Sequence, residues 1–408
     1  MLFRFSLYGF LKNQRYFEPF IILAFRQKGL DFAAIGILIG FREICINLLE
    51  IPTGAIADAL GRRHSMIASF LAYIISFFVF GISAQLWMLF PAMFFFSVGE
   101  AFRTGTHKAM IFAWLEFNNR QDKKTEVYGF TRSWSKIGSA VSVIIAAVLM
   151  FFSNDYSKIF LFSIVPAVLN ILNFLSYPDY VDGETKGRSM ADIGTILWNT
   201  LKTAVTHKAM RRLLIESANY EGLFKTSKEY VQPIIKTVAL AMPLLLGLQE
   251  DKRTAIMIGL VYVILYLLSS YASRHANAVV TFFRSEAQAS SFLWFFNLCI
   301  YGFMAVGVLL RFNVLLILTF ILYNVAQNIW RPILVGRVAN LAKSERTATV
   351  LSVESQTSSL FVAVCAPLLG WAVDVTAQIN ASLRFLPLAL LGLSITVLML
   401  LTKKPKIA

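Results

Sequence analysis

Long runs of apolar residues recur along the whole chain, separated by shorter polar connections. Five of these runs contain no charged residue and reach the roughly 18 residues that a helix needs to cross a hydrocarbon core of about 30 Å. A transmembrane β-barrel would instead show short segments of alternating polarity. The pattern therefore predicts an all-α polytopic membrane protein. The uncharged runs cover residues 65–84, 159–176, 254–271, 290–310 and 385–402.

Further apolar runs are equally long but carry a few charged residues. With the uncharged runs they predict about twelve transmembrane helices. The longest polar connection follows the sixth of them, which predicts two bundles joined by a linker, as internal repeats produce. We expect a six-helix bundle over 1–176, a cytoplasmic linker over 177–210 and a second six-helix bundle over 211–408, with a central cavity. The charged runs cover residues 2–26, 34–59, 87–114, 128–152, 211–240, 313–338 and 347–373.

Composition and charge support a membrane protein. The chain is 57% hydrophobic and 15% charged, whereas soluble domains average about 25% charged residues. The net charge of +15 does not indicate nucleic-acid binding, because Lys and Arg concentrate on alternate connections, as the positive-inside rule describes. We expect a bacterial-type inner membrane, cytoplasmic termini and no cleaved signal peptide. Since Cys45, Cys299 and Cys365 all fall within predicted spans, we expect no disulfide, metal or other cofactor.

The first apolar run contains four consecutive polar residues, Lys12 to Arg15. A helix that began only after Arg15 would extend about 15 Å to Phe25, too short to cross the membrane. A helix that begins at Leu2 places the polar residues near mid-membrane, with Lys12, Arg15 and Glu18 along one broad face. Charges at that depth are costly unless they face protein or water.

Charged residues also occur inside most of the other predicted spans, while the third, sixth, ninth and twelfth spans carry none. This distribution predicts a water-filled cavity whose ionisable walls form a pathway for substrate and protons. The alternative is a structural network of mutually neutralised charges, since some pairs are three or four residues apart in one helix. With Lys12, Arg15 and Glu18, the candidate pathway residues are Arg42, Glu43, Glu100, Arg103, Glu221, Lys225, Arg331 and Glu354.

Four of these candidates call for specific readings. Glu221 and Lys225 are four residues apart, a spacing that also suits a solvated helix on the membrane surface. Arg331 lies near a helix end, where its long side chain can reach the headgroups. Glu354 is an isolated acid in an apolar helix, which makes it a candidate proton carrier.

The stretch "GAIADALGRR", Gly54–Arg63, lies where the second predicted helix leaves the membrane. It resembles motif A of the major facilitator superfamily at Gly54, Asp58, Gly61, Arg62 and Arg63. Gly54 would allow a close helix approach, Gly61 a tight turn, and Asp58 a cap on the third helix. Arg62 and Arg63 also fit simple positive-inside anchors. The resemblance implies the fold of that superfamily, alternating access and a gate at motif A.

Further stretches resemble bacterial members near the drug:proton antiporter group. They are "EIPTGAIAD", "GEAFRTGTHKAM", "YVQPII" and "RTATVLS". The resemblance places Arg103 at the arginine of motif B, which is tied to proton coupling. The chain departs from that group after Arg103, where it reads "RTGTHK", and in the fifth helix, which lacks the antiporter motif.

The predicted spans hold a surplus of cationic side chains, which would attract anions in a low-dielectric cavity. We therefore expect a monomeric secondary transporter of a small anionic or zwitterionic organic solute, coupled to protons. The alternatives are a multidrug/H+ efflux antiporter and a lysolipid flippase or uniporter of the same fold. A receptor or enzyme is a third class, but no nucleophile or metal cluster indicates an enzyme. The cations are Lys12, Arg15, Arg42, Arg103, Lys108, Arg132, Lys136, Lys225, Lys228, Lys236 and Arg331.

Overall fold

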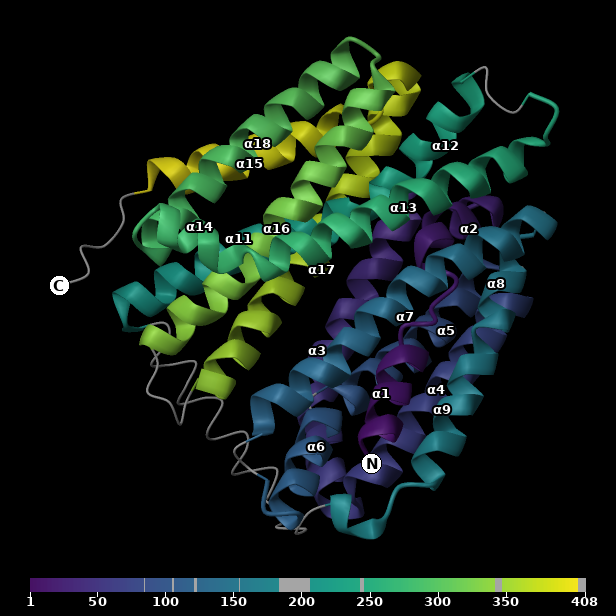
Figure 1. Cartoon of the computed structure of the whole chain (residues 1–408). Helices are drawn as coiled ribbons and strands as arrows, with labels where there is room; N and C mark the ends of the chain where they lie inside the picture. Colours follow the sequence, from purple (N-terminus) through teal and green to yellow (C-terminus); the bar gives the residue numbers. More distant parts are fainter. Residues whose placement is uncertain are drawn as a thin grey trace. The chain divides into compact units, whose positions relative to one another are not determined.

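The structure, a computed structural model, consists of helices and contains no strand in the residues that it describes (Figure 1). Helices satisfy every backbone hydrogen bond within one segment, which lipid requires of a spanning chain. The all-α polytopic fold predicted from the sequence is therefore confirmed. The described residues are 1–83, 85–104, 106–120, 123–153, 155–182, 206–242, 246–341 and 347–402.

The chain forms two compact units. The N-terminal unit comprises residues 1–28 and 41–194, and the C-terminal unit comprises residues 29–40 and 195–408. Helix α3 (Phe32–Leu60) contributes to both. The N-terminal unit also holds α1 (Leu2–Leu11), η1 (Glu18–Phe20), α2 (Ile21–Gln27), α4 (Arg62–Ile82), α5 (Leu86–Arg103), α6 (Thr106–Phe117), α7 (Lys124–Phe152), α8 (Ser157–Phe162), α9 (Ile164–Leu175) and η3 (Asp179–Asp182).

The C-terminal unit holds the remaining helices. Most of the predicted linker lies outside the described residues, so the bundle boundaries 1–176 and 211–408 stay a prediction. The helices are α11 (Lys208–Ser227), η4 (Lys228–Tyr230), α12 (Val231–Ala241), α13 (Glu250–Arg274), α14 (Ala276–Phe282), α15 (Glu286–Leu309), α16 (Asn313–Leu341), α17 (Thr347–Ile379), η6 (Ala381–Leu383) and α18 (Leu386–Leu401).

Within the described residues, nine segments are helical, long and apolar enough to cross a membrane. They coincide with nine of the twelve predicted spans. The others, predicted over 2–26, 87–114 and 211–240, fold as pairs of shorter helices: α1 with α2, α5 with α6, and α11 with α12. Each break lies beside charged residues. The nine spans are Phe32–Glu50, Arg62–Ile82, Val127–Phe152, Ser157–Leu175, Glu250–Arg274, Glu286–Leu309, Asn313–Val338, Val350–Ile379 and Ala381–Leu401.

The continuous helix predicted over residues 2–26 is wrong, because α1 ends before Lys12. Pro19 lacks a backbone N–H, and its ring would clash with the carbonyl four residues earlier in a helix. Side-chain amides hold the interrupted segment against α7. Asn13 Nδ2 donates to the Ser135 carbonyl at 2.9 Å, and Gln14 Nε2 donates to the Gly138 carbonyl at 3.0 Å.

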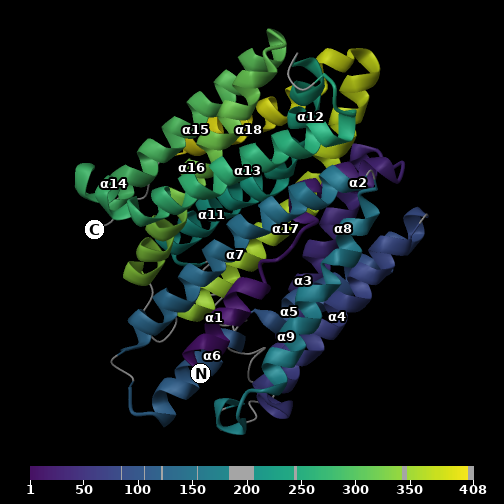
Figure 2. The same ribbon diagram turned by 45° about the vertical axis from the view of Figure 1, so that its right-hand side comes forward.

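In the N-terminal unit, α4 packs against α5 and α9, and α1 packs against α7 (Figure 2). Gly99 brings α5 close to α4. A Cβ at this position would lie 2.8 Å from the ring of Tyr73. Ser69 Oγ also donates to the Gly99 carbonyl at 2.7 Å. This close approach places Tyr73 beside the last turn of α5.

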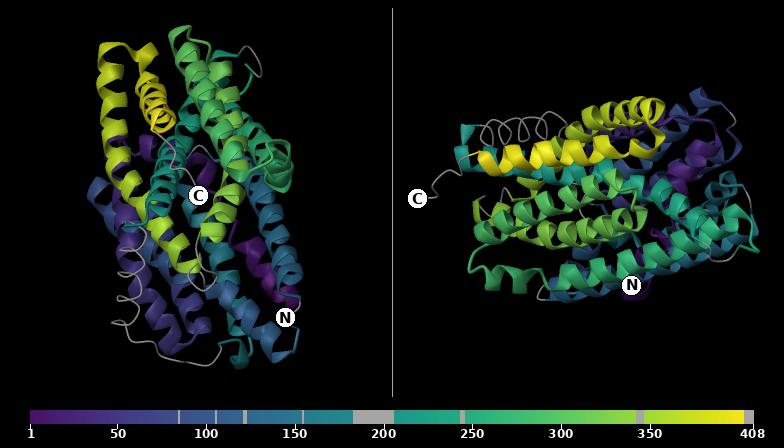
Figure 3. Two further views of the ribbon diagram at one scale, coloured as in Figure 1. Left: turned by 90° about the vertical axis from the view of Figure 1, so that its left-hand side faces the viewer. Right: turned by 90° about the horizontal axis from the view of Figure 1, so that it is seen from above.

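In the C-terminal unit, α15 packs against α16 and α18, and α11 packs against α17. Figure 3 shows α17 and α18, in yellow-green and yellow, joined by a short turn that contains η6. The start of α3 also packs on α17. Cβ atoms at Gly36 and Gly370 would overlap the carbonyls of Ala366 and Phe32. Residues 29–40 therefore belong to this unit.

Candidate functional site

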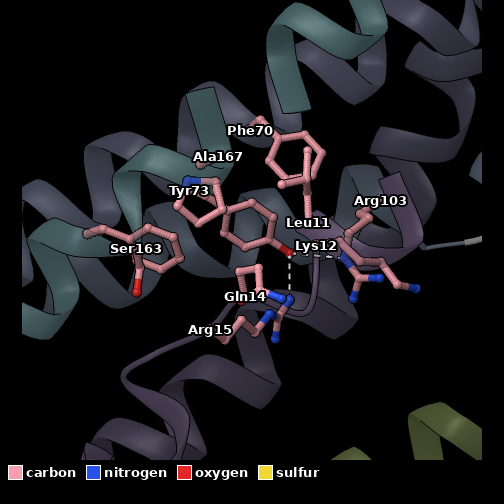
Figure 4. A pocket seen from close by; sticks show the side chains of 11 residues that line it. Leu11, Lys12, Gln14, Arg15, Phe70, Tyr73, Arg103, Ser163 and Ala167 are labelled. Atoms are coloured by element: carbon pink, nitrogen blue, oxygen red, sulfur yellow. Dashed lines mark hydrogen bonds between the residues drawn. The ribbon is translucent and has the colours of Figure 1, made fainter. Parts of the chain in front are cut away.

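Four polar side chains of the N-terminal unit form a network that we call the N-terminal charge cluster: Arg15, Tyr73, Glu100 and Arg103. Glu100 is central, since one carboxylate oxygen pairs with Arg15 Nη2 and the other with Arg103 Nη2. The Tyr73 hydroxyl accepts hydrogen bonds from Arg15 at 3.3 Å and from Arg103 at 3.2 Å (Figure 4). One carboxylate therefore forms ion pairs with two guanidinium groups.

The interrupted helices position this cluster. Arg15 lies in the non-helical segment between α1 and η1, while Glu100 and Arg103 occupy the last turn of α5. The i, i+3 pairing of Glu100 with Arg103 agrees with the sequence spacing. Arg15 and Tyr73 join from segments distant in sequence, and no local spacing indicated them. Ion pairs that neutralise one another, the structural alternative predicted from the sequence, are thus part of this cluster.

A small pocket adjoins the N-terminal charge cluster (Figure 4). Lys12 Nζ lies 5.4 Å from the ring centroid of Tyr8. Within the part of the chain that is described, no carboxylate lies within ion-pair distance of Lys12. The basic side chains at the pocket, Lys12, Arg15 and Arg103, therefore outnumber Glu100, the carboxylate that pairs with two of them. The pocket is lined by Leu11, Lys12, Gln14, Arg15, Phe70, Tyr73, Phe77, Arg103, Ser163, Pro166 and Ala167.

The C-terminal unit contains a second network, which we call the C-terminal charge cluster: Ser217, Glu221, Gln327, Arg331 and Glu354. Arg331 Nη1 lies 2.8 and 2.9 Å from the two carboxylate oxygens of Glu354, and 3.9 Å from Glu221 Oε1. Gln327 Nε2 donates to Glu221 at 3.1 Å, and Ser217 Oγ donates to Glu354. Glu221 and Glu354 are 5% and 1% exposed. Two buried carboxylates therefore meet one guanidinium group.

These contacts correct three expectations from the sequence. Glu354 is not isolated, because α11 packs on α17 and brings Ser217 to it, while Arg331 reaches it from α16. Arg331 is therefore committed to an ion pair rather than to the headgroups alone. Glu221 is buried, not on a solvated helix, since that face of α11 packs inside the unit.

Glu216, adjacent to Ser217 on α11, is not among the candidates predicted from the sequence. It is 1% exposed and pairs with two arginines. Arg212 Nε lies 3.1 Å and Arg337 Nη1 lies 2.7 Å from its carboxylate oxygens. Arg337 also donates to Ser290 Oγ at 2.9 Å. Like Glu100, Glu216 is served by two guanidinium groups.

The remaining candidate pathway residues lie outside both clusters. Arg42 and Glu43 are consecutive in α3 and pair with each other at 2.8 Å. Glu18 begins η1, where the chain resumes helical geometry after the first break. Lys225 lies in the last turn of α11, one turn beyond Glu221.

Motif A forms the turn between α3 and α4. Gly61 has a φ of 94°, which confirms the predicted tight turn, since other residues are strained there. No described atom lies within 4 Å of a Cβ at Gly54, so the close approach predicted there is not found. The side chain of Asp58 lies outside the described residues. Arg62 Nη1 donates to the Ala109 carbonyl at 3.4 Å.

Acidic residues after α9 hold the motif A turn. Asp182 Oδ1 accepts from the backbone N–H of Arg63 at 2.5 Å, and so caps the start of α4. Arg63 Nη1 lies 2.7 Å from Asp179 Oδ1 and donates to the Tyr177 carbonyl at 2.9 Å. Arg63 therefore makes specific side-chain contacts, in addition to the positive-inside anchoring expected of it. No local pattern indicated Asp179 or Asp182, because both lie far along the chain from the turn.

The chain is similar to known membrane transporters. The family model described as the Major Facilitator Superfamily matches residues 10–367. The uncharacterized MFS-type transporter YxaM of Bacillus subtilis (strain 168) is 24% identical over 230 residues. That match covers 54% of this chain and 54% of YxaM, so the chain spans about half the length of this relative.

Two solved structures share the fold over nearly the whole chain. The nucleoside transporter NupG superposes with a TM-score of 0.78 at 14% identity, covering 98% of this chain and 97% of NupG. A POT family transporter in complex with 5-aminolevulinic acid gives 0.70 at 16% identity, covering 98% and 94%. At these identities the likeness shows the fold alone. The predicted likeness to the drug:proton antiporter group is not confirmed by these matches.

Proposed function

Because the chain belongs to the Major Facilitator Superfamily and is a transporter, not an enzyme, we propose that it moves a small anionic or zwitterionic organic solute by alternating access, coupled to protons. The observation that carries the charge preference is that basic side chains outnumber acidic ones beside the N-terminal pocket. An anionic group of the solute would offset that surplus.

Lys12 is the residue on which this proposal chiefly depends. Arg15 and Arg103 already share Glu100, so a bound carboxylate or phosphate would add to existing ion pairs. Lys12 has an aromatic neighbour, Tyr8, but no carboxylate partner among the described residues. A cation–π contact is worth only about 0.5–2 kcal/mol and supplies no negative charge to pair with the Lys12 ammonium group. A solute anion would supply that partner.

The solved structures support the solute class in a limited way. 5-Aminolevulinic acid, bound to the POT family transporter, is a zwitterion. It shows that this fold accommodates a small solute of that charge class. NupG is a transporter of nucleosides, which supports a solute of similar size. The proposed charge of the solute rests on the basic pocket and not on NupG.

We further propose that the protein acts as a monomer in a bacterial-type inner membrane, with both termini cytoplasmic. The excess of Lys and Arg on alternate connections supports this orientation. In the proposed cycle, Gly54, Asp58, Gly61, Arg62 and Arg63 form the motif A gate, and the contacts of Arg63 with Asp179 support a role for the turn in one state of that gate.

A thermal-unfolding screen of the purified protein tests the proposal. Organic carboxylates, phosphate esters, lysolipids and lipophilic cations would be compared on wild type, Lys12→Met and Lys158→Met. Lys158 is an exposed lysine on α8 and is the matched control. A ligand at 100 times its dissociation constant stabilises by about 2.7 kcal/mol.

We expect anions to stabilise wild type and Lys158→Met but not Lys12→Met. The stabilising anion is then tested for flux in proteoliposomes. Stabilisation by lipophilic cations alone would contradict the proposal in favour of a multidrug exporter. Stabilisation by lysolipid alone would favour a flippase.

A further inference from the structure

The carboxylates inside the two units differ in how many arginines pair with each of them. Glu100 and Glu216 each pair with two guanidinium groups. Glu221 and Glu354 together have one, from Arg331. Among the buried acids of the described helices, these two are the ones that share a single arginine.

Arg331 lies closer to one of the two acids than to the other. Its Nη1 lies 2.8 Å from Glu354 but 3.9 Å from Glu221. The short hydrogen bond of Glu221 comes instead from Gln327, a neutral amide, at 3.1 Å. Glu354 therefore takes most of the available positive charge.

Other groups around the pair do not remove this imbalance. Lys225, one turn further along α11, also acts electrostatically on Glu221, but more weakly than Arg331 and than the opposing charge of Glu354. From α17 the charged neighbour is Glu354 itself. Helix α18, which also packs on α11, carries no charged side chain. Glu216, earlier on α11, is engaged by its own arginines.

A buried carboxylate without a cation is held more cheaply as the neutral acid than as the anion. Two carboxylates that share one guanidinium group are therefore electrically balanced when they hold one proton between them. We propose that Glu221 and Glu354 share one proton, and that this proton is the one coupled to transport. The inference rests on the proton coupling in the proposed function.

Hydroxyl groups beside the pair suit proton exchange. Ser217 Oγ donates to Glu354. Ser358 lies one turn beyond Glu354 on the same face of α17, is 1% exposed, and its Oγ has no hydrogen-bond partner in the described structure. The Arg331 side chain is 39% exposed. The pair thus has a buried hydroxyl and a partly exposed arginine side chain as neighbours.

Infrared difference spectra of the purified protein in lipid, recorded while the pH is changed, test the shared proton without a substrate. A protonated carboxyl group has a C=O stretching band that an ionised carboxylate lacks. We expect one such band in wild type, because one of the two acids is neutral. The variants are Glu221→Gln and Glu354→Gln, with Glu216→Gln as the matched control.

Each of the two pair variants leaves one carboxylate facing one arginine, so the remaining acid ionises. We therefore expect the band to disappear in both Glu221→Gln and Glu354→Gln and to persist in Glu216→Gln. Loss in only one variant would show a single carrier and overturn the sharing. Persistence of the band in both, or its absence from wild type, would also overturn the proposal. Arg331→Gln provides an independent check, since without the guanidinium group the band should increase.

A second arm separates this inference from the proposed function. Proteoliposomes loaded with a pH-sensitive dye report proton movement when the solute found in the screen is added. Solute flux that moves no protons, beside an intact infrared result, would contradict the coupling but not the shared proton. Coupled flux that both pair variants abolish while solute exchange persists would support both.

Discussion

The two charge clusters use the same residue types in opposite proportions. In the N-terminal charge cluster one carboxylate, Glu100, serves two arginines, with Lys12 nearby. In the C-terminal charge cluster one arginine, Arg331, serves two carboxylates. A buried surplus of positive charge is best relieved by an anion, and a buried surplus of negative charge by a proton. In the proposed function, the two clusters therefore have different tasks in transport.

The largest expected effect comes from removing one arginine from each cluster. Arg331→Gln leaves two buried carboxylates without a cation and should destabilise the protein by about 3–5 kcal/mol. Arg15→Gln leaves Glu100 with Arg103 and should cost much less. Thermal unfolding of purified variants measures both, with Arg337→Gln as a control that leaves Glu216 with Arg212.

The pH dependence of this loss has a definite sign. In Arg331→Gln the acids are tolerated when protonated and destabilising when ionised. The loss should therefore be smaller at about pH 5 than at about pH 8. Equal losses in Arg331→Gln and Arg15→Gln at both pH values would remove the contrast between the clusters.

Removing the carboxylate of the N-terminal charge cluster makes the opposite change, since it leaves arginines without an acid. Glu100→Gln leaves Arg15 and Arg103 without their carboxylate and should cost about 2 kcal/mol, the scale of a charged hydrogen bond. Inorganic phosphate or sulfate should then stabilise this variant more than wild type, as measured by thermal unfolding. Glu216→Gln, whose arginines lie away from the pocket, is the control. An equal response to anions in both variants would contradict the assignment of anion binding to the N-terminal pocket.

Lys12→Met should separate binding from stability. Lys12 has no ion pair to lose within the described structure, so the unliganded protein should change by no more than about 0.5 kcal/mol. The affinity for the solute anion should fall at least tenfold, equivalent to about 1.4 kcal/mol. Isothermal titration and thermal unfolding measure the two quantities. A large loss of stability with unchanged affinity would make Lys12 a structural residue.

The smallest effects concern the amides that support each cluster. Gln14→Leu removes the hydrogen bond to Gly138, and Gln327→Leu removes the one to Glu221. Each should cost about 1 kcal/mol in thermal unfolding. Only Gln327→Leu should shift the infrared band of the protonated carboxyl group. A shift in both variants, or in neither, would weaken the assignment of that band to the C-terminal charge cluster.

Local sequence pattern predicted the spanning helices and the contacts within one helix, and little beyond them. The pairing of Glu100 with Arg103 follows from their spacing on α5. Neither the approach of Arg15 to Glu100 nor that of Arg331 to Glu354 does, because each depends on how separate helices pack. Apolar length alone predicts a continuous helix through Lys12, whereas Pro19 and the side-chain amide of Asn13 favour the interruption that the structure contains.

One measurement tests the separation of tasks most directly. Binding of the solute identified in the screen would be measured by isothermal titration at about pH 6 and about pH 8 in wild type, Lys12→Met and Glu221→Gln, since coupled binding must depend on pH. The account predicts that Lys12→Met loses binding at both pH values, while Glu221→Gln binds with an affinity that no longer changes with pH. Normal binding by Lys12→Met, or an unaltered pH dependence in Glu221→Gln, would contradict it.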